Sequence, residues 1–336
     1  MPKIDLHRHL EGSLRLETLI EIGQTFGLNW PVHNVERFRP YVQIIDDPQT
    51  HEAFLSKFHV LRHFYRSPEA IDRLAYEAVV DAAADNVRYL ELRFSPQALA
   101  RARNFDLADV TDWVTQATDR ASREHQIEVG LIVTLVRHDP LEQAAQVTDI
   151  ACRRAGRGIV GLDLAGDEVK YAAQPFLPLF QQAKASGLGI TIHAGEWANA
   201  RGIREAITDL QAERIGHGVR AVEDSEVLRL VCDSQKTLEV CLTSNLQSGV
   251  VQHMSQHPLL DLLNWGARVT LNTDDPCVSG LTLTDEYQTA VDMFGLDYAT
   301  LRQLILNAAH AAFLPSAERK RLVADFEAML PSTDPC

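Results

Sequence analysis

Paired cysteines and long apolar runs are both missing from this 336-residue sequence. Its five cysteines are scattered and nowhere form a Cys-x-x-Cys pair, which argues against a disulfide framework and against a cysteine zinc knuckle. No apolar run is long enough to span a bilayer, and the first β-prone run starts too early to leave room for a signal peptide. We therefore expect a cytoplasmic protein. The cysteines are Cys152, Cys232, Cys241, Cys277 and Cys336.

Positive charge is also scarce. The 32 Lys and Arg residues stand against 46 Asp and Glu residues, a formal charge of −14. Nucleic acids and anionic membranes are bound chiefly through clustered Lys and Arg, so neither is expected as a partner. We expect a small molecule instead. No low-complexity linker divides the chain, which predicts one domain over residues 1–336.

Short β-prone runs alternate with helical patterns along the chain. This alternation predicts parallel strands joined by right-handed crossovers, and eight such units favour closure into a barrel that leaves no edge strand. The predicted fold class is α/β, a (β/α)8 TIM barrel with a helical insertion after strand 1 and extra C-terminal helices. The expected strands are 4–9, 87–94, 128–135, 159–164, 189–193, 215–218, 238–242 and 268–272.

Candidate metal ligands stand at the ends of several of these runs. In the first strand, side chains two positions apart point to the same face, so His7 and His9 project together. His193 closes a later run, and the pair Asp274 and Asp275 follows another. Because the carboxyl ends of barrel strands share one mouth, we expect these side chains to converge there.

Imidazoles with a carboxylate suit Zn²⁺ better than Mg²⁺ or Ca²⁺, which prefer oxygen ligands. Catalytic zinc usually has three protein ligands and an open position, so Asp274 as a fourth ligand makes the metal five-coordinate with its water. Zinc lowers the pKa of that water to about 7, which supplies hydroxide at neutral pH without a Ser or Cys nucleophile.

Two more residues have several possible roles. Glu196 follows His193 by three positions and serves either as a proton donor with a pKa raised by burial or as a helix cap. His217 orients the water, acts as a fourth zinc ligand or lies in the core, and its flanking glycines allow close approach. The remaining histidines are interpreted as structural or solvated: His33, His51, His59, His63, His125, His138, His253, His257 and His310.

Seven motifs occur in order between residue 3 and about residue 280. Together they resemble the adenosine deaminase family of the amidohydrolase superfamily, particularly its bacterial members, and jointly they are highly specific. The motifs are DLHRHLEG at 5–12, ELRFSP at 91–96, DLAGDE at 163–168, HAGE at 193–196, RIGHG at 214–218, TSN at 243–245 and NTDDP at 272–276.

The resemblance implies zinc-dependent deamination of adenosine and 2′-deoxyadenosine to an inosine-type product and ammonia, with one zinc per chain. The implied ligands are His7, His9, His193 and Asp274, and Glu196 is implied to protonate purine N1. Protonation makes C6 electrophilic, so hydroxide adds there and ammonia leaves.

Further roles follow from the same resemblance. It implies that His217 positions the hydroxide, that Asp275 hydrogen-bonds N7 and that the Gly166 backbone N–H faces N3. The substrate-binding candidates are His9, Glu11, Gly166 and Asp275.

Glu11 departs from the family pattern. Many adenosine deaminases have Asp at this position, where it contacts the ribose 5′-hydroxyl, whereas relatives that act on free adenine often have Glu. The extra methylene either occupies the sugar's space or reaches the same hydroxyl by another route. Adenine deamination is therefore the first alternative, and amino-deoxyfutalosine deamination the second.

Two other classes are weaker candidates. Binuclear hydrolases of the superfamily bridge two metals with a lysine at the end of the fourth strand, but here Lys170 lies past that position, which favours one metal. A catalytically inactive zinc- or purine-binding protein has no use for Glu196, His217 and Asp275, which are all present.

Overall fold

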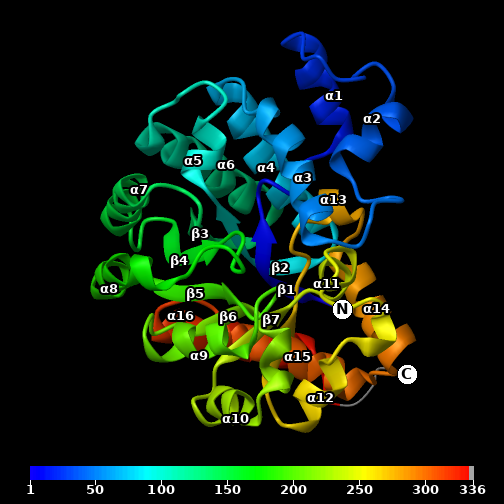
Figure 1. The fold of residues 1–336 in the computed structure, drawn as a ribbon, viewed down its shortest axis with the longest axis vertical. Helices are drawn as coiled ribbons and strands as arrows, with labels where there is room; N and C mark the ends of the chain where they lie inside the picture. The colour runs from blue at the N-terminus through cyan, green and yellow to red at the C-terminus, as the bar shows by residue number, and fades with distance from the viewer. Residues whose placement is uncertain (333–336) are drawn as a thin grey trace.

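Eight parallel strands form the centre of the molecule. In the computed structural model, which describes residues 1–332, each strand pairs with its successor in the chain, from β1 to β8. Helices connect the strands and pack around them (Figure 1). The predicted TIM barrel is confirmed. The strands are β1 (Lys3–His9), β2 (Val87–Phe94), β3 (Glu128–Val136), β4 (Ile159–Ala165), β5 (Gly189–Ala194), β6 (Arg214–His217), β7 (Thr237–Val240) and β8 (Arg268–Leu271).

The two ends of the sheet meet at Asp274, just beyond β8. Its N–H donates to the His7 carbonyl oxygen over 2.8 Å, and its carbonyl oxygen accepts from the His9 N–H over 2.8 Å. A parallel bridge also joins Arg8 to Asp274. The backbone contact that nearly closes the barrel therefore brings the chain after β8 to the end of β1.

Helices occur in both of the predicted additions. An insertion after β1 contains α1 (Leu16–Thr25), α2 (Val35–Val42), α3 (His51–Leu61), the 3-10 turn η1 (Arg62–Phe64) and α4 (Pro68–Ala84). In Figure 1, α1 and α2 lie apart from the strands. At the other end of the chain, α15 packs against β8 and β1, and α16 packs against α15. These C-terminal helices are α14 (Leu283–Phe294), α15 (Tyr298–Ala311) and α16 (Ser316–Met329).

The remaining helices follow individual strands. They are α5 (Pro96–Ala100), α6 (Leu107–His125), α7 (Leu141–Arg153), η2 (Gln174–Phe176), α8 (Leu177–Ala185), α9 (Ala200–Thr208), η3 (Val219–Glu223), α10 (Ser225–Asp233), α11 (Leu242–Gln247), η4 (Met254–Gln256), α12 (Leu259–Asn264) and α13 (Pro276–Ser279). Several of these helices are capped at the N-terminus by a side-chain oxygen. Examples are Ser95 and Asp106, whose side chains accept hydrogen bonds from backbone N–H groups of the first turn.

The strands are buried on both faces, as expected for a barrel whose interior is filled and whose outside is covered by helices. Residues 130–135 of β3 are all buried and mostly apolar. Several ionisable residues break this pattern, among them Glu91, Arg93, Asp163 and Glu239, which are fully buried within strands. Buried charges need partners. Arg93 pairs with Asp163 and Glu239, and Glu91 pairs with Arg214.

Two sequence features have direct structural counterparts. The four cysteines among the described residues are free thiols, and Cys336 lies outside those residues. Within residues 1–332, no helix combines the length and the apolar character that crossing a membrane requires.

Candidate active site

Histidine and carboxylate side chains converge at the carboxyl ends of the strands. The potential ligand atoms of His7, His193, His217 and Asp274 all lie within 4.8 Å of one another. His9 lies beside this group, with its Nε2 atom 3.3 Å from His193 Nε2 and 3.3 Å from Asp274 Oδ1. The structure thus brings together His7, His9, His193, His217 and Asp274, whereas Asp275 is not part of this cluster.

Strained backbone positions two of these residues. His217 and Asp274 both have a φ angle of 60°, in the left-handed region that residues other than glycine rarely adopt. At Asp274, the two hydrogen bonds to β1 hold that conformation. Such strain persists only where the surrounding structure enforces it, and it concentrates at functional sites.

Carboxylates orient two of the imidazoles from behind. His7 Nδ1 lies 2.8 Å from Glu239 Oε2, and His193 Nδ1 lies 3.0 Å from Asp163 Oδ1. Each carboxylate accepts a hydrogen bond from Nδ1–H, which leaves the lone pair on Nε2, facing the cluster. The His7 Nε2 atom is buried without a hydrogen-bond partner. Imidazoles held by carboxylates with a free nitrogen are the usual arrangement around a protein-bound metal, so these residues fit a zinc ion.

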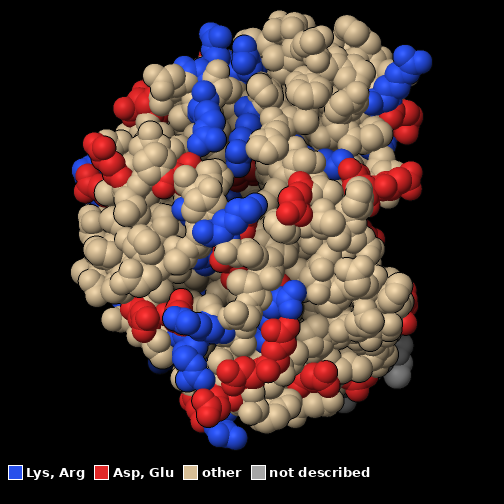
Figure 2. Space-filling view, viewed as in Figure 1, with Lys and Arg blue, Asp and Glu red and all other residues tan. Residues whose placement is uncertain are grey.

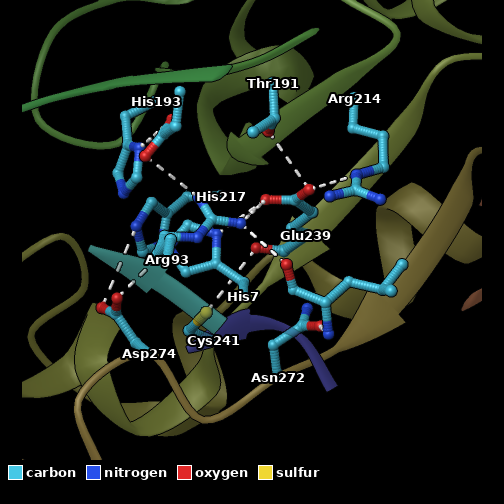
Figure 3. A network of polar contacts seen from close by, with 12 residues as sticks. His7, Arg93, Thr191, His193, Arg214, His217, Glu239, Cys241, Asn272 and Asp274 are labelled. Atoms are coloured by element: carbon cyan, nitrogen blue, oxygen red, sulfur yellow. Dashed lines mark hydrogen bonds and ion pairs between the residues drawn. The ribbon is translucent and has the colours of Figure 1, made fainter. Parts of the chain in front are cut away.

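A buried ion network fixes those carboxylates (Figure 3). Arg93 Nη2 lies 2.8 Å from Glu239 Oε2, and Arg93 Nη1 lies 3.3 Å from Asp163 Oδ2. Arg214 Nε lies 2.5 Å from Glu239 Oε1. Burial opposes ionisation of Glu239, but the charges of Arg93 and Arg214 and the hydrogen bond from His7 hold its pKa well below the usual value. Glu239 therefore stays anionic behind His7.

A chain of hydrogen bonds sets the tautomer of His217. The Leu259 N–H donates to His257 Nδ1 over 3.1 Å, so His257 carries its hydrogen on Nε2 and donates it to Asn245 Oδ1 over 3.1 Å. The Asn245 amide nitrogen then donates to His217 Nδ1 over 3.1 Å. His217 consequently carries its hydrogen on Nε2, which faces Glu196 Oε2 at 3.6 Å and Asp274 Oδ2 at 4.0 Å.

Glu196 is buried at the edge of this cluster. Burial, followed by the negative charges of Asp274, Glu168 and Asp275, raises its pKa well above the usual value. A carboxyl group in this environment holds its proton more readily than usual and can act as a proton donor. The helix-cap interpretation is wrong, because the side chain that accepts at the start of α9 is Asn199.

A cavity of about 410 Å³ opens over the cluster. This volume lies within the range of about 300–1,000 Å³ that is typical of small-molecule sites. Glu196 and His217 line this cavity. So do all four substrate-binding candidates, which are His9, Glu11, Gly166 and Asp275.

Two carboxyl groups in the cavity have unused oxygen atoms. Glu11 Oε1 accepts the Ser95 N–H over 2.7 Å, whereas Glu11 Oε2 is buried without a partner. Asp275 Oδ1 is likewise buried and unpartnered, packed so close to Gly12 that a Cβ there would lie 1.9 Å from it. Burial raises the pKa of Glu11 to about 7, and burial with the neighbouring charge of Asp274 raises that of Asp275 well above its usual value. Unpaired buried groups that line a cavity are available to a ligand.

Several supporting residues were not identified from the sequence. Glu239, Arg93 and Arg214 had no assigned role, and neither did Asn245, while His257 was interpreted only as structural or solvated. Glu239, Arg93 and Arg214 could have been found from the sequence, because each is an ionisable residue inside an apolar strand and such a residue requires a buried partner. Asn245 and His257 lie in helical segments and loops, where their residue types carry no such signal.

Comparisons with known proteins agree with the motifs. The family model described as adenosine deaminase matches residues 2–329. Proteins named adenosine deaminase from Aliivibrio fischeri and Klebsiella pneumoniae are 38% and 39% identical to the chain, over 96% of it and 96% and 97% of their own lengths.

Solved structures agree as well. An adenine deaminase from Arthrobacter aurescens superposes with a TM-score of 0.89 at 26% identity, covering 98% of each chain. Arabidopsis ADAL complexed with IMP gives a TM-score of 0.87 at 28% identity, covering 98% of this chain and 97% of that one. The chain therefore belongs to the adenosine deaminase family, whose members are hydrolases of C–N bonds.

Proposed function

We propose that the chain, as one domain, deaminates adenosine and 2′-deoxyadenosine to the inosine-type products and ammonia. The observation that carries this proposal is the convergence of His7, His9, His193 and Asp274 beside Glu196, whose pKa is raised by burial. All of these residues except His7 line one cavity. The relatives named adenosine deaminase, at 37–40% identity over 96% of the chain, support the same reaction.

One zinc ion per chain fits the ligand set His7, His9, His193 and Asp274. The tautomer of His217 argues against its being a ligand, because its Nε2 atom carries the hydrogen and has no free lone pair. The position of Lys170 supports a single metal, since its Nζ atom lies 2.9 Å from Asp167 Oδ2 and its side chain is 63% exposed. When bound, zinc lowers the pKa of water to about 7 and so makes a nucleophile available.

The chain's own residues supply the proton transfers. Glu196 donates to purine N1, which withdraws electrons from C6 and allows the attacking oxygen to add there. His217 donates a hydrogen bond from Nε2–H to that oxygen, keeps the proton and fixes the direction of approach. In the adduct, the hydroxyl group on C6 gives its proton to N6; the C6–N6 bond then breaks, C6=O forms and N6 leaves as ammonia, while N1 keeps the proton from Glu196. The proton that water releases on becoming hydroxide restores Glu196.

Other residues orient the purine ring. N7 is a hydrogen-bond acceptor, so Asp275 must be protonated to bind it, which agrees with its raised pKa. The Gly166 N–H faces N3, and the φ angle of 98° at Gly166 turns the backbone in a way that a larger residue disfavours. His9 lies on the same cavity wall and limits where the ring can sit.

Glu11 favours a nucleoside over the free base. Its buried Oε2 atom has no partner in the protein and can accept a hydrogen bond from a ribose hydroxyl. Free adenine would leave this acceptor unpaired, which costs binding energy. Adenine remains the second candidate because the adenine deaminase from Arthrobacter aurescens has the same fold over 98% of its chain.

Substrate choice is tested by a side-by-side ultraviolet absorbance assay with the zinc-loaded protein. We expect adenosine and 2′-deoxyadenosine to be deaminated with a higher kcat/KM than adenine, because only the nucleosides pair with Glu11. A strong preference for adenine would reverse the order of the two candidates, and absence of ammonia release from all three would refute the proposed reaction.

Asp275→Ala should weaken purine binding while the metal stays bound. Its carboxyl group is buried at the cavity and donates to N7 in the proposed complex, so we expect KM to rise roughly 5- to 150-fold, as for a buried acceptor left without its partner at a cost of about 1–3 kcal/mol. Inhibitor titration measures the binding, and metal analysis checks the zinc. An unchanged KM would remove Asp275 from the binding site.

A further inference from the structure

Glu168 contacts the backbone of the segment that carries Glu196. We call residues 195–198 the acid segment. Glu168 Oε1 accepts hydrogen bonds from three of its backbone N–H groups, over 2.7, 2.6 and 2.9 Å. Glu168 Oε2 accepts from the fourth, that of Gly195, over 3.0 Å. Successive backbone N–H groups that point to one place form an anion-binding site, and here a carboxylate of the chain itself occupies it.

The acid segment belongs to neither of the regular elements beside it. It lies between β5, which ends at Ala194, and α9, which begins at Ala200. The φ angle of 64° at Gly195 lies in the left-handed region, and a Cβ atom there would lie 2.4 Å from the Ile203 side chain. Backbone N–H groups need partners, and Glu168 pairs with all four in the segment. The course of the chain through Glu196 therefore depends on this one side chain.

Arg220 contacts the same segment from its carbonyl side. Its Nε atom donates to the Glu196 carbonyl oxygen over 2.9 Å, and its backbone N–H donates to the Gly195 carbonyl oxygen over 3.0 Å. Glu168 follows β4, and Arg220 lies in η3 after β6, so the two residues come from the strands on either side of β5. The acid segment is thus held from both neighbours of its own strand.

Contacts, and not charge alone, distinguish Glu168. Charged side chains of both signs surround a hollow near the middle of the molecular face (Figure 2). Within residues 1–332, Glu168 forms no ion pair with a Lys, Arg or His side chain, and its four hydrogen bonds all come from the acid segment. A carboxylate bonded in this way fixes a backbone and does not serve a neighbouring charge.

We propose that Glu168 and Arg220 are positioning residues for the deamination, which fix the acid segment so that the Glu196 carboxyl group reaches purine N1. This inference rests on the proposed function. Both residues lie outside the cavity lining, so they act through Glu196 and do not touch the substrate. Proton transfer requires a heavy-atom distance of about 2.6–3.2 Å, and a displacement of about 1 Å can cost roughly 100-fold in rate.

Glu168→Gln tests the proposal with a side chain of nearly the same shape. Glutamine offers one acceptor oxygen, and its amide nitrogen meets the remaining N–H groups as a second donor. We expect kcat to fall by about 10- to 100-fold, with KM within about threefold of the wild type and one zinc per chain, because the proton donor moves while the substrate and metal contacts remain. Glu142→Gln, exposed in the first turn of α7 and outside the cavity lining, is the control and should keep kcat.

The Glu196→Gln background shows whether Glu168 acts through Glu196. If it does, adding Glu168→Gln to Glu196→Gln should change kcat by no more than about threefold, because the group being positioned no longer donates a proton. If Glu168→Gln lowers kcat by the same factor in both backgrounds, or keeps kcat within threefold of the wild type when introduced alone, the proposal is overturned.

Hydrogen exchange provides a readout that needs no turnover. We expect peptides covering residues 193–199 to exchange about tenfold or more faster in Glu168→Gln than in the wild type, the size of one lost hydrogen bond to a charged group. Peptides from β2 and β3 should exchange at the wild-type rate. Faster exchange of this segment in a protein that deaminates none of the three substrates would refute the proposed reaction and still support the fixing of the segment by Glu168. Unchanged exchange would overturn the proposal in either case.

Arg220→Gln tests the same segment even if Glu168→Gln does not fold. It removes the Nε donor to the Glu196 carbonyl oxygen, whereas the backbone contact of residue 220 remains. We expect kcat to fall by about tenfold, as for one charge-assisted hydrogen bond, and this loss should disappear in the Glu196→Gln background. A loss that persists in that background, or no loss at all, would contradict the assignment.

Discussion

Glu196→Gln is expected to abolish most ammonia release while leaving zinc bound. The glutamine has nearly the same shape but cannot give a proton to N1, so C6 is not activated; a positioned acid contributes about 10²–10⁴-fold to rate. We therefore expect kcat to fall by that factor. Glu196 Oε2 lies 3.6 Å from His217 Nε2, and neither residue is among the proposed ligands, so metal analysis should still give one zinc per chain.

The control for this prediction is Glu318→Gln, which removes an exposed carboxylate on α16, away from the cavity. It should match the wild type in both kcat and zinc content. Turnover by Glu196→Gln at the wild-type rate would defeat the assignment of Glu196 as the proton donor. Loss of zinc in the same variant would show instead that Glu196 supports the metal.

Glu239→Gln is expected to have the largest effect on stability. Glu239 is fully buried and pairs with Arg93 and Arg214 as well as with His7, so its neutralisation leaves two buried guanidinium groups short of a counter-charge. Removing one partner of a buried ion pair typically costs about 3–5 kcal/mol. We expect the free energy of unfolding, measured with denaturant on the metal-free protein, to fall by about this amount.

The same variant should also bind zinc more weakly. Glu239 holds the hydrogen on His7 Nδ1 and raises the basicity of Nε2, and loss of such a support usually costs about 10- to 100-fold in metal affinity. Competition with a chelator measures that affinity. Glu213→Gln, at an exposed position just before β6, is the control and should change stability by no more than about 0.5 kcal/mol. Wild-type stability and zinc affinity in Glu239→Gln would show that the network has no supporting role.

The barrel was predictable because each unit of the sequence repeats the same physical pattern. A buried run such as 128–135 becomes a strand covered on both sides, and the helix after it returns the chain to the same end of the sheet. Boundaries were less accurate where strand and helix adjoin. The run 238–242 was expected to be strand throughout, but β7 ends at Val240 and α11 begins at Leu242.

The convergence of the candidate ligands was predictable from that fold alone. Strand ends must meet at one mouth, so His7, His9, His193 and Asp274 could be placed together before any distance was known. The partners behind them could not be placed. Glu239 lies 232 positions from His7, and nothing local in either segment pairs the two.

The aromatic residues of 52–65 show how one pattern serves two purposes. In the sequence, Phe54, Phe58, Leu61 and Tyr65 stand at helical spacing, a pattern that fits either the buried face of a helix or part of a lid. Leu61 and Tyr65 are fully buried and lie outside the cavity lining, whereas Phe54 and Phe58 line the cavity. Helical periodicity indicates only that the side chains share a face, and it does not show what that face covers.

Zinc content is the most direct measure of the central claim that one ion is held by residues from β1, β5 and the segment after β8. We expect one zinc per chain in the wild type and in His217→Ala, and less than one in His9→Ala, since His217 presents an N–H to the cluster whereas His9 Nε2 lies 3.3 Å from both His193 Nε2 and Asp274 Oδ1. Two zinc ions in the wild type, or zinc retained by His9→Ala and lost from His217→Ala, would contradict it.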